Sequence, residues 1–450
     1  MTPLRHRVAV LGGGISGLVS ALRLLQQGKQ VTIFEASGEL GGLGSTFDLE
    51  GHAVERFYHV MLNSDEYLLP LLKELDLEDR IVWKETRMGF LHGRKLYPFN
   101  TPLDVLNFGG LSLWGRIRTA IGGAYITKFC NDPKGLDSIS VSEWLQDLFG
   151  AEVFNRLWKP LLRAKFGDLF EEVPAYWFWS RLRREKGGTK EVKGYVRGGY
   201  RLIAERLEKE IRRLGGEIRM RTPVFAIQDT PWDVQLNVSG RWEAFDASIS
   251  TLPMPVLGDI ARGPLAAMLP NKNLVYQGVV NAVVIMKKRL QPYYWNAIVK
   301  KDYPFQGLVE TTHVVPSSQT GGRHLVYLLN YCQADSNIYN QTDGDIRFQA
   351  LKVLRDFNSK FQPDWVEEIK VFRTPFVEPI WPLGYQKEKP RMRVGDSRVY
   401  LATTAQCYPN VNSWNTMVGI ANDTAGRVKF DLDNVYNNRH QPVGSMSDSR

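Results

Sequence analysis

The sequence predicts an α/β fold, in which helices pack on a mainly parallel sheet. Two observations lead to this fold class. The chain begins with a strand, a glycine-rich turn and a helix, followed by a second strand that ends at Glu35. Two later segments, 198–253 and 397–428, look like further pieces of the same architecture. Strands that alternate with helical patterns are typical of parallel sheets with crossover helices.

The opening βαβ unit follows from local residue patterns. Residues 7–11 are rich in β-formers, and residues 15–27 repeat apolar side chains at helical spacing. Gly28 stands where it can end that helix, and residues 30–36 favour the second strand. This order predicts a Rossmann-like unit.

The later pieces follow the same logic. Segment 198–253 predicts an amphipathic helix, a Gly-Gly stop, a strand through Val224 and three further strands that end at Thr251. Segment 397–428 predicts a strand, an irregular polar loop and a closing helix.

The intervening segments differ in character. Residues 65–179 are largely helical in pattern and rich in Trp and Phe, whereas residues 274–380 contain predicted strands such as 278–286 and 324–332. The polar tail after Asn437 is predicted to be disordered.

Composition excludes several classes of protein. The 450 residues are 43% hydrophobic and 23% charged, which is typical of a globular protein with two or three compact units. The three cysteines form no CxxC, so neither a disulfide framework nor a thiolate metal site is predicted, and no metal is expected. This cysteine usage, and a start without a secretory layout, favour a cytoplasmic protein.

Charge and hydropathy bear on the partners. Part of the net charge of +9 is concentrated in residues 181–201, which could attract a nucleotide phosphate, a lipid headgroup or nucleic acid. A solvated basic surface is the favoured interpretation, and no nucleic-acid-binding pattern is present, so nucleic acid is not expected. The apolar segment 103–127 is interrupted by charged residues, which argues against a membrane span but leaves a peripheral membrane contact open.

The opening turn carries a recognisable chemistry. Gly12 and Gly14 match the first two glycines of G-x-G-x-x-G, and Gly17 matches the third. Such glycines permit the tight turn, the approach of a pyrophosphate to the helix N-terminus, and close packing of helix on strand. Glu35 stands where an acid accepts hydrogen bonds from an adenosine ribose. The turn is therefore predicted to bind a dinucleotide, with simple packing as the alternative.

A second glycine loop follows the acid, with Gly41, Gly42, Gly44 and Ser45. With this loop the chain resembles the superfamily of FAD-dependent amine oxidases, phytoene desaturases and protoporphyrinogen oxidases. Segments 197–224, 249–253 and 399–421 resemble later motifs of that superfamily. The resemblance implies an FAD domain and an inserted α+β substrate domain. The FAD domain would comprise residues 1–64, 190–258 and 391–436, and the substrate domain residues 65–189 and 259–390.

The resemblance also implies a site. Tyr58-His59 is similar to an aromatic-His pair beside the flavin in UDP-galactopyranose mutases. His59 is the candidate proton shuttle, since an ordinary pKa of about 6.5 suits transfer in either direction. The implied cofactor-binding residues are Gly12, Gly14, Ile15, Ser16, Gly17, Glu35, Ala36, Gly42, Leu43, Gly44, Ser45, Tyr58, His59, Val224, Thr404, Asn412, Thr416 and Met417. The candidate substrate-pocket residues are Asn281, Trp381, Tyr385, Tyr408 and Trp414, with core packing as the alternative for the four aromatic residues.

Departures from the superfamily narrow the function. Where many amine oxidases have a lysine, the most similar strand offers Asn281 or Ala282, so an amine oxidase mechanism is not predicted. Thr403-Thr404 replaces the usual Gly-Asp or Gly-Glu of the C-terminal motif. We expect an FAD-dependent oxidoreductase that dehydrogenates or oxidises a sugar-linked, isoprenoid or secondary-metabolite substrate. A non-redox flavin-dependent sugar mutase and a non-catalytic lipid-binding protein are the alternatives, and the oligomeric state is left open.

Overall fold

A computed structural model describes residues 6–436, apart from residues 94, 132, 185–190 and 299–302. One half of the fold is built on a five-stranded, all-parallel sheet of order β10-β2-β1-β14-β20. The strands are β1 (Arg7–Leu11), β2 (Gln30–Phe34), β10 (Glu217–Arg219), β14 (Ala247–Ser250) and β20 (Val399–Leu401). Segments far apart in the sequence therefore form one sheet. The predicted tail 437–450 and part of the basic stretch lie outside the described residues.

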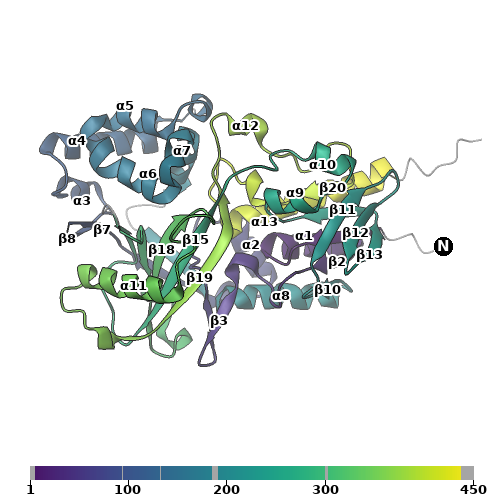
Figure 1. Cartoon of the computed structure of the whole chain (residues 1–450), viewed down its shortest axis with the longest axis horizontal. Coiled ribbons are helices and arrows are strands. Elements are labelled where there is room, and N and C mark those ends of the chain that lie inside the picture. The colour runs from purple at the N-terminus through teal and green to yellow at the C-terminus, as the bar shows by residue number, and fades with distance from the viewer. Residues whose placement is uncertain (1–5, 94, 132, 185–190, 299–302, 437–450) are drawn as a thin grey trace, which may run out of the picture.

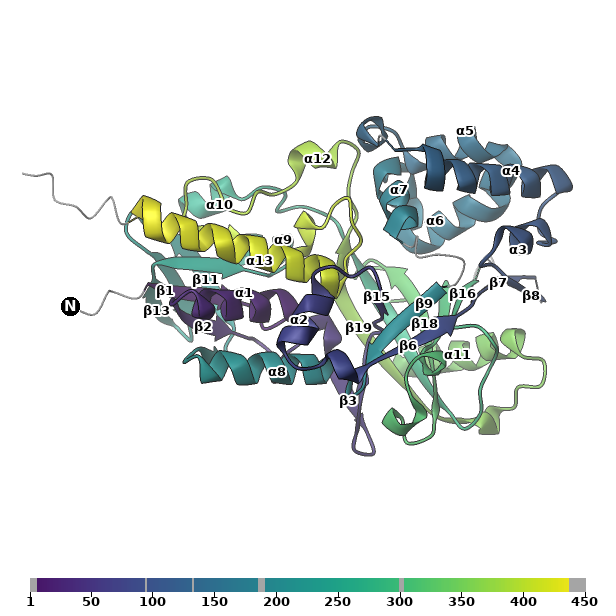
Figure 2. The same cartoon turned by 180° about the vertical axis from the view of Figure 1, so that it is seen from behind.

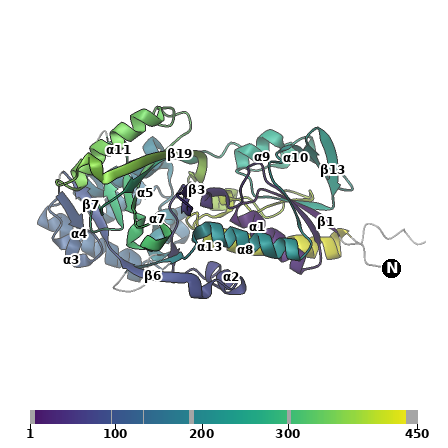
Figure 3. The same cartoon turned by 90° about the horizontal axis from the view of Figure 1, so that it is seen from below.

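Three helices cover one face of this sheet, and a small antiparallel sheet lies on the other (Figure 3). Phe245 of the small sheet packs against Phe34 of β2, with ring centroids 5.8 Å apart. The helices are α1 (Ile15–Gln26), α8 (Gly199–Arg213) and α13 (Trp414–Asp431). The opposite side comprises β11 (Val224–Asp229), β12 (Val234–Val238), β13 (Arg241–Phe245), α9 (Met254–Ile260) and α10 (Pro264–Met268).

A seven-stranded sheet forms the second half of the molecule (Figure 1), in the order β19-β15-β18-β17-β16-β7-β8. Neighbouring strands are antiparallel except β16 and β7. Its strands are β7 (Met88–His92), β8 (Lys95–Pro98), β15 (Tyr276–Met286), β16 (Trp295–Ile298), β17 (Gly307–Glu310), β18 (His324–Cys332) and β19 (Val366–Pro379). The predicted strand 324–332 is correct, because β-branched and aromatic residues there fit a buried sheet.

A helical unit stands beside this sheet, and Figure 2 shows it from behind. Aromatic edge contacts form part of its core, such as Trp158 against Phe178 with ring centroids 5.2 Å apart. The unit comprises α3 (Pro102–Leu106), α4 (Leu113–Ala124), α5 (Val141–Val153), α6 (Lys159–Phe166) and α7 (Ala175–Arg184). Shorter turns join them: η3 (Tyr125–Phe129), η4 (Lys134–Asp137), η5 (Phe154–Trp158) and η6 (Gly167–Glu172).

The first part of the segment predicted to be helical differs from that prediction. Residues 81–86, 88–92 and 95–98 form the strands β6, β7 and β8. Because β6 pairs with β9 (Glu191–Val196) and β7 pairs with β16, cross-strand partners decide the local structure. The small sheets and connections are β3 (Thr46–Leu49), β4 (His52–Glu55), β5 (Met61–Leu62), β6 (Ile81–Thr86), β9 (Glu191–Val196), α2 (Leu68–Glu74), α11 (Asp343–Phe357) and α12 (Tyr385–Glu388). The remaining short helices are η1 (Gly42–Gly44), η2 (Glu78–Arg80), η7 (Thr311–His313), η8 (Ser317–Gln319), η9 (Pro363–Trp365), η10 (Thr404–Gln406) and η11 (Leu432–Tyr436).

The topology bears on the predicted domains. Strands from both predicted parts of the substrate domain join in the seven-stranded sheet, through the pairing of β7 with β16. The domain boundaries themselves stay a prediction. Among the described residues, no helix has the length and apolar character that crossing a bilayer requires.

Candidate active site

The carboxyl ends of four parallel strands meet at one edge of the five-stranded sheet. The chain runs from β1 into Gly12, from β2 into Glu35, from β14 into Thr251 and from β20 into Ala402. Thr251 donates its backbone N–H to Leu11, and the Ser16 hydroxyl donates to the Ala402 carbonyl at 2.7 Å. From β1 the sheet continues through β2 and β10 on one side, and through β14 and β20 on the other. Doubly wound sheets form their ligand crevice at such a reversal of strand order, here between β1 and β14.

The opening turn is packed so tightly that side chains are excluded. Gly12 adopts a φ of +103°, and a β-carbon there would lie 2.4 Å from the Thr251 hydroxyl oxygen. A β-carbon on Gly17 would lie 1.9 Å from the Gly12 carbonyl oxygen. Gly14 begins α1 without a side-chain cap, so the positive end of the helix dipole faces this edge uncovered by a side chain.

Glu35 and the second glycine loop, residues 41–45, lie against the opening turn, residues 12–17. We call these three elements together the cradle. The Glu35 carboxylate accepts the backbone N–H of Gly13 at 2.6 Å and that of Ser37 at 2.7 Å. Gly41 donates to the Gly13 carbonyl at 2.9 Å, and a β-carbon on Gly42 would come within 3.2 Å of the Gly14 α-carbon. Ala36, Leu43 and Ser45 are part of these same loops. An acid, a helix N-terminus and a surface without side chains together fit an adenosine ribose and a pyrophosphate.

His59 lies at the centre of a small aromatic cluster. Its ring centroid is 4.8 Å from that of Tyr200 and 6.0 Å from that of Trp414. Burial lowers the pKa of His59 to about 4, against the opposing effect of the Phe57 carbonyl, which Nδ1 contacts at 2.7 Å. A carbonyl can only accept, so Nδ1 carries the proton and the neutral ring leaves Nε2 as an acceptor.

The predicted pocket aromatics fall into two groups. Trp414 packs on the second glycine loop, where a β-carbon on Gly44 would lie 2.4 Å from its ring. Tyr408 instead lies 5.6 Å from Trp381 and 5.5 Å from Tyr385 between ring centroids. These three side chains are almost completely buried, as expected if they pack in the core of the protein. Their contact with a substrate stays a prediction.

The remaining predicted residues make contacts with other parts of the protein. Asn281 is fully buried and donates its amide to the Arg56 carbonyl, three residues before His59. Asn412 donates its side-chain amide to Val377, and the Thr404 hydroxyl contacts that of Tyr276 at 3.3 Å. The Thr416 hydroxyl donates to Val411, Met417 contacts the Cys407 sulfur, and Val224 begins β11. Their contacts with a cofactor stay predictions.

A recess beside His59 contains a carboxyl group that the sequence analysis missed. Glu55 is 5% exposed and accepts the Tyr195 hydroxyl and the Tyr200 backbone N–H, each at 2.9 Å. Burial raises the pKa of Glu55, although the Tyr200 N–H lowers it. Tyr327 closes the recess and donates its hydroxyl to the Glu55 carbonyl. Glu55 thus couples the segment before His59 to the start of α8.

A buried ion pair was also missed. The Lys165 ammonium of α6 lies 2.8 Å from the Glu378 carboxylate of β19. Lys165 also lies 4.9 Å from the ring centroid of Tyr331, which hydrogen-bonds Tyr58. Burial lowers the pKa of Lys165, and Glu378 opposes that shift. The other carboxylate oxygen of Glu378 accepts the Asn412 backbone N–H at 3.5 Å, so the pair connects the helical unit with the C-terminal loop.

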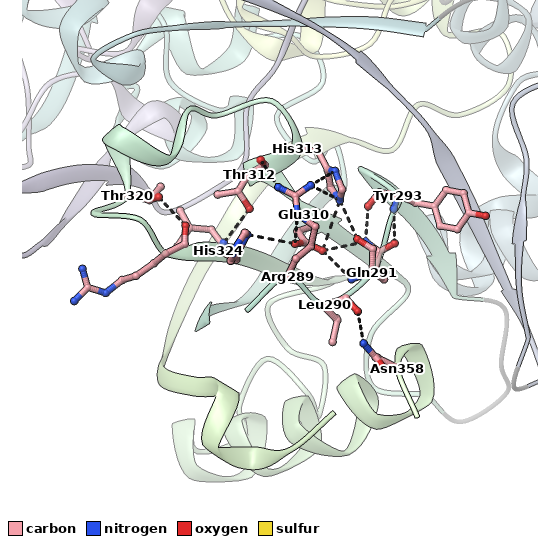
Figure 4. Close-up of polar contacts among 12 residues, drawn as sticks. Arg289, Leu290, Gln291, Tyr293, Glu310, Thr312, His313, Thr320, His324 and Asn358 are labelled. Atoms are coloured by element: carbon pink, nitrogen blue, oxygen red, sulfur yellow. Dashed lines mark hydrogen bonds and ion pairs between the residues drawn. The ribbon is translucent and has the colours of Figure 1, made fainter. Parts of the chain in front are cut away.

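A second polar cluster lies where β17 ends and β18 begins (Figure 4). Glu310 is fully buried and faces His313 at 3.7 Å and His324 at 3.9 Å. Arg289 donates to His313 Nδ1 at 2.6 Å. Thr311, next to Glu310, belongs to the wall of the recess, so this cluster supports that wall from behind.

With this geometry established, comparison with known proteins identifies the family. The profile of the flavin-containing amine oxidoreductases matches residues 15–411, and the chain belongs to that family. It is 29% identical over 180 residues to the zeta-carotene desaturase of Solanum lycopersicum, covering 35% of this chain and 31% of the relative. It is 31% identical over 175 residues to the coproporphyrinogen III oxidase of Staphylococcus aureus, covering 37% of each. The chain thus spans about a third of the length of these curated relatives.

A solved structure resembles the fold over almost the whole chain. Reduced UDP-galactopyranose mutase superposes with a TM-score of 0.76 and 15% identity, covering 97% of this chain and 98% of the mutase. These findings confirm the predicted superfamily, the fold class and FAD as the cofactor. The chain is a member of a family of FAD-dependent oxidoreductases.

Proposed function

We propose that this protein oxidises an organic substrate by passing a hydride or an electron pair to FAD. The observation that carries the proposal is the contact between the two glycine loops and Glu35, an arrangement that fits the adenosine and pyrophosphate of the cofactor. When bound, FAD supplies the two-electron acceptor, and the protein supplies orientation, exclusion of water and proton handling.

The protein's own residues divide these tasks. Burial lowers the pKa of His59 to about 4, below the ordinary value of about 6.5, so the ring is neutral at neutral pH and a weaker base than expected from the sequence. Its Nε2 is the atom that accepts a proton from the substrate. The Lys165–Glu378 pair fixes Tyr331, and through it Tyr58, beside His59. Trp414 and Tyr200 pack against the His59 ring and limit its contact with water.

The proposed reaction is dehydrogenation or oxidation of a C–H bond. The zeta-carotene desaturase and the coproporphyrinogen III oxidase support this class, because both relatives are named for an oxidation. Among the predicted sugar-linked, isoprenoid and secondary-metabolite substrates we therefore favour an isoprenoid, and we expect no amine substrate. Asn281 or Ala282 at the position of the amine oxidase lysine agrees with that expectation.

The test is anaerobic reduction of the bound flavin. The purified holoprotein is mixed with pools of isoprenoid, sugar-linked and amine compounds, and the flavin absorbance is followed. We expect bleaching by an isoprenoid or sugar-linked pool and none by amines. A protein that takes up no FAD would refute the proposal at its first step.

A sugar mutase is the second candidate. The structural likeness to UDP-galactopyranose mutase and the Tyr58-His59 pair favour it. The discriminating experiment is incubation of the dithionite-reduced protein with UDP-sugars. Rearrangement of a sugar nucleotide without net oxidation, together with no bleaching by any pool, would replace the oxidase proposal by the mutase.

A further inference from the structure

Helix α4 has an unusual distribution of side chains. Its buried positions are Gly115, Thr119 and Gly122, which face α5. The approach is close, since a β-carbon on Gly122 would lie 2.5 Å from the Phe149 ring. A helix on the surface of a globular protein normally turns its large apolar residues toward the core. Here the small residues make the internal contact.

Most large apolar residues of α4 and η3 instead point to solvent, whereas Ile126 of η3 is buried. Trp114 is 68% exposed, Ile121 63% and Phe129 70%. Leu113 and Tyr125 are exposed as well, and the spacing from Trp114 through Ile121 and Tyr125 to Phe129 is 7, 4 and 4 residues. Such spacing places these four side chains on one face of the helix, and Leu113 adjoins Trp114 at the start of α4. We call these five residues the α4 face.

The α4 face extends to the preceding helix. Leu103 of α3 is 66% exposed, and Leu106 is exposed too. Arg116 of α4 donates to the Leu106 carbonyl at 3.0 Å, which holds the two helices together. Figures 1 and 2 both place α4 at the outer end of the helical unit, away from the parallel sheet. Contiguous exposed apolar residues of this kind mark an interaction site.

The composition of the face indicates a lipid surface as its partner. Trp114 and Tyr125 combine an apolar ring with a polar atom, as side chains at the boundary of a bilayer do. Residues 103–129 contain three basic residues against a single acid, Asp104. Arg116 and Arg118 donate to backbone carbonyls of the protein, so Lys128 is the exposed cation that favours anionic headgroups. Lys128 is exposed next to Phe129.

We infer that the α4 face docks this protein on the surface of a membrane that contains anionic lipids. The helix lies in the plane of the headgroups, the exposed apolar side chains of the α4 face enter the acyl boundary, and Lys128 contacts phosphate groups. This inference concerns a surface outside the cradle and holds whichever substrate the protein oxidises.

The test is flotation of the full-length holoprotein with vesicles. Vesicles of phosphatidylglycerol and phosphatidylcholine are compared with vesicles of phosphatidylcholine alone, at low and at high salt. We expect binding to the anionic vesicles that weakens at high salt. Trp114→Ser and Ile121→Ser should each lower the partition coefficient by about tenfold, because each removes a large apolar side chain from the contact. Lys128→Glu should weaken binding to the anionic vesicles alone.

Two matched controls lie elsewhere on the molecule. Trp232 is 70% exposed in the turn between β11 and β12, and Phe348 is 72% exposed on α11. Trp232→Ser and Phe348→Ser should leave flotation unchanged. Flavin absorbance and melting temperature verify that every variant remains folded.

Three outcomes would overturn the inference. The first is a wild-type protein that floats with neither kind of vesicle. The second is a Trp232→Ser variant that loses as much flotation as Trp114→Ser does. The third is a dimer in light scattering that Ile121→Ser dissociates, with no binding to lipid, which would assign the face to a second copy of the chain.

Discussion

Lys165 of α6 and Glu378 of β19 form an ion pair at 2.8 Å, with side chains 20% and 7% exposed. The two residues are 213 positions apart in the sequence, and their contact joins the helical unit to the seven-stranded sheet. Removing one charge from such a pair leaves the other buried without compensation.

Lys165→Met should therefore destabilise the protein by about 3 kcal/mol, the low end for a broken buried pair, because a fifth of the Lys165 side chain still reaches solvent. Urea unfolding measures the change. The double variant with Glu378→Gln should recover part of the loss, since no unpaired charge remains. Arg163→Met, which removes an exposed pair with Asp168, is the control and should cost about 0 to 1 kcal/mol. An equal cost for both pairs would contradict the prediction.

Gly17→Ala should abolish stable FAD binding. The added β-carbon would lie 1.9 Å from the Gly12 carbonyl oxygen, and the turn would have to move away from the cofactor. We expect the dissociation constant for FAD to rise by about a hundredfold or more, as the position of the pyrophosphate is lost. Gly123→Ala on α4 is the control, because no atom lies within 4 Å of its added β-carbon. Retention of flavin by Gly17→Ala would refute the proposed cradle.

Glu35→Gln should weaken FAD binding by about tenfold or more, because hydrogen bonds to an ionised acceptor are stronger than those to an amide. Isothermal titration of the apoprotein with FAD measures the affinity. Glu35→Asp keeps the charge but shortens the side chain, and we expect an intermediate affinity. Unchanged affinity in Glu35→Gln would place the ribose elsewhere.

His59 should make the stability of the protein depend on pH. Its folded-state pKa of about 4 is lower than its pKa of about 6.5 in an unfolded chain. The unfolded state therefore binds the proton first, and stability is lost as the pH falls from about 6.5 to 4. Compared with His59→Gln, the wild-type protein should lose more stability between pH 7 and pH 4.5 in urea unfolding. Parallel curves for the two proteins would contradict the shifted pKa.

The same residue should affect the rate of flavin reduction. If Nε2 of His59 accepts a proton from the substrate, His59→Gln should slow anaerobic flavin reduction by about a hundredfold or more. Stopped-flow absorbance with a reducing substrate measures this rate. The spectrum of the bound flavin should persist in the variant, which separates lost chemistry from lost cofactor. An unchanged rate would leave His59 a packing residue.

Parts of the cradle could be predicted because they are local. Gly12, Gly17 and Glu35 lie within 30 residues, and their spacing along one strand, turn and helix carries the information. The carbonyl of a residue only five positions away excludes a β-carbon at Gly17. The spacing of the glycines therefore already indicates how the turn packs. The strands at 81–98 were not predicted, because their pairing partners β9 and β16 come much later in the chain.

The sequence alone determined the α/β class and the glycine turns, because short-range spacing and steric exclusion specify them, and its resemblance to a flavoprotein superfamily implied FAD, which the family match confirms. Only the tertiary structure decided that Lys165 pairs with Glu378 and that Glu55 accepts the Tyr200 backbone N–H. It also decided that Trp414 packs on Gly44 and not beside Tyr408. Those contacts join distant segments. Their energies come from burying charges and rings together, and no spacing along the chain records which buried groups will become neighbours.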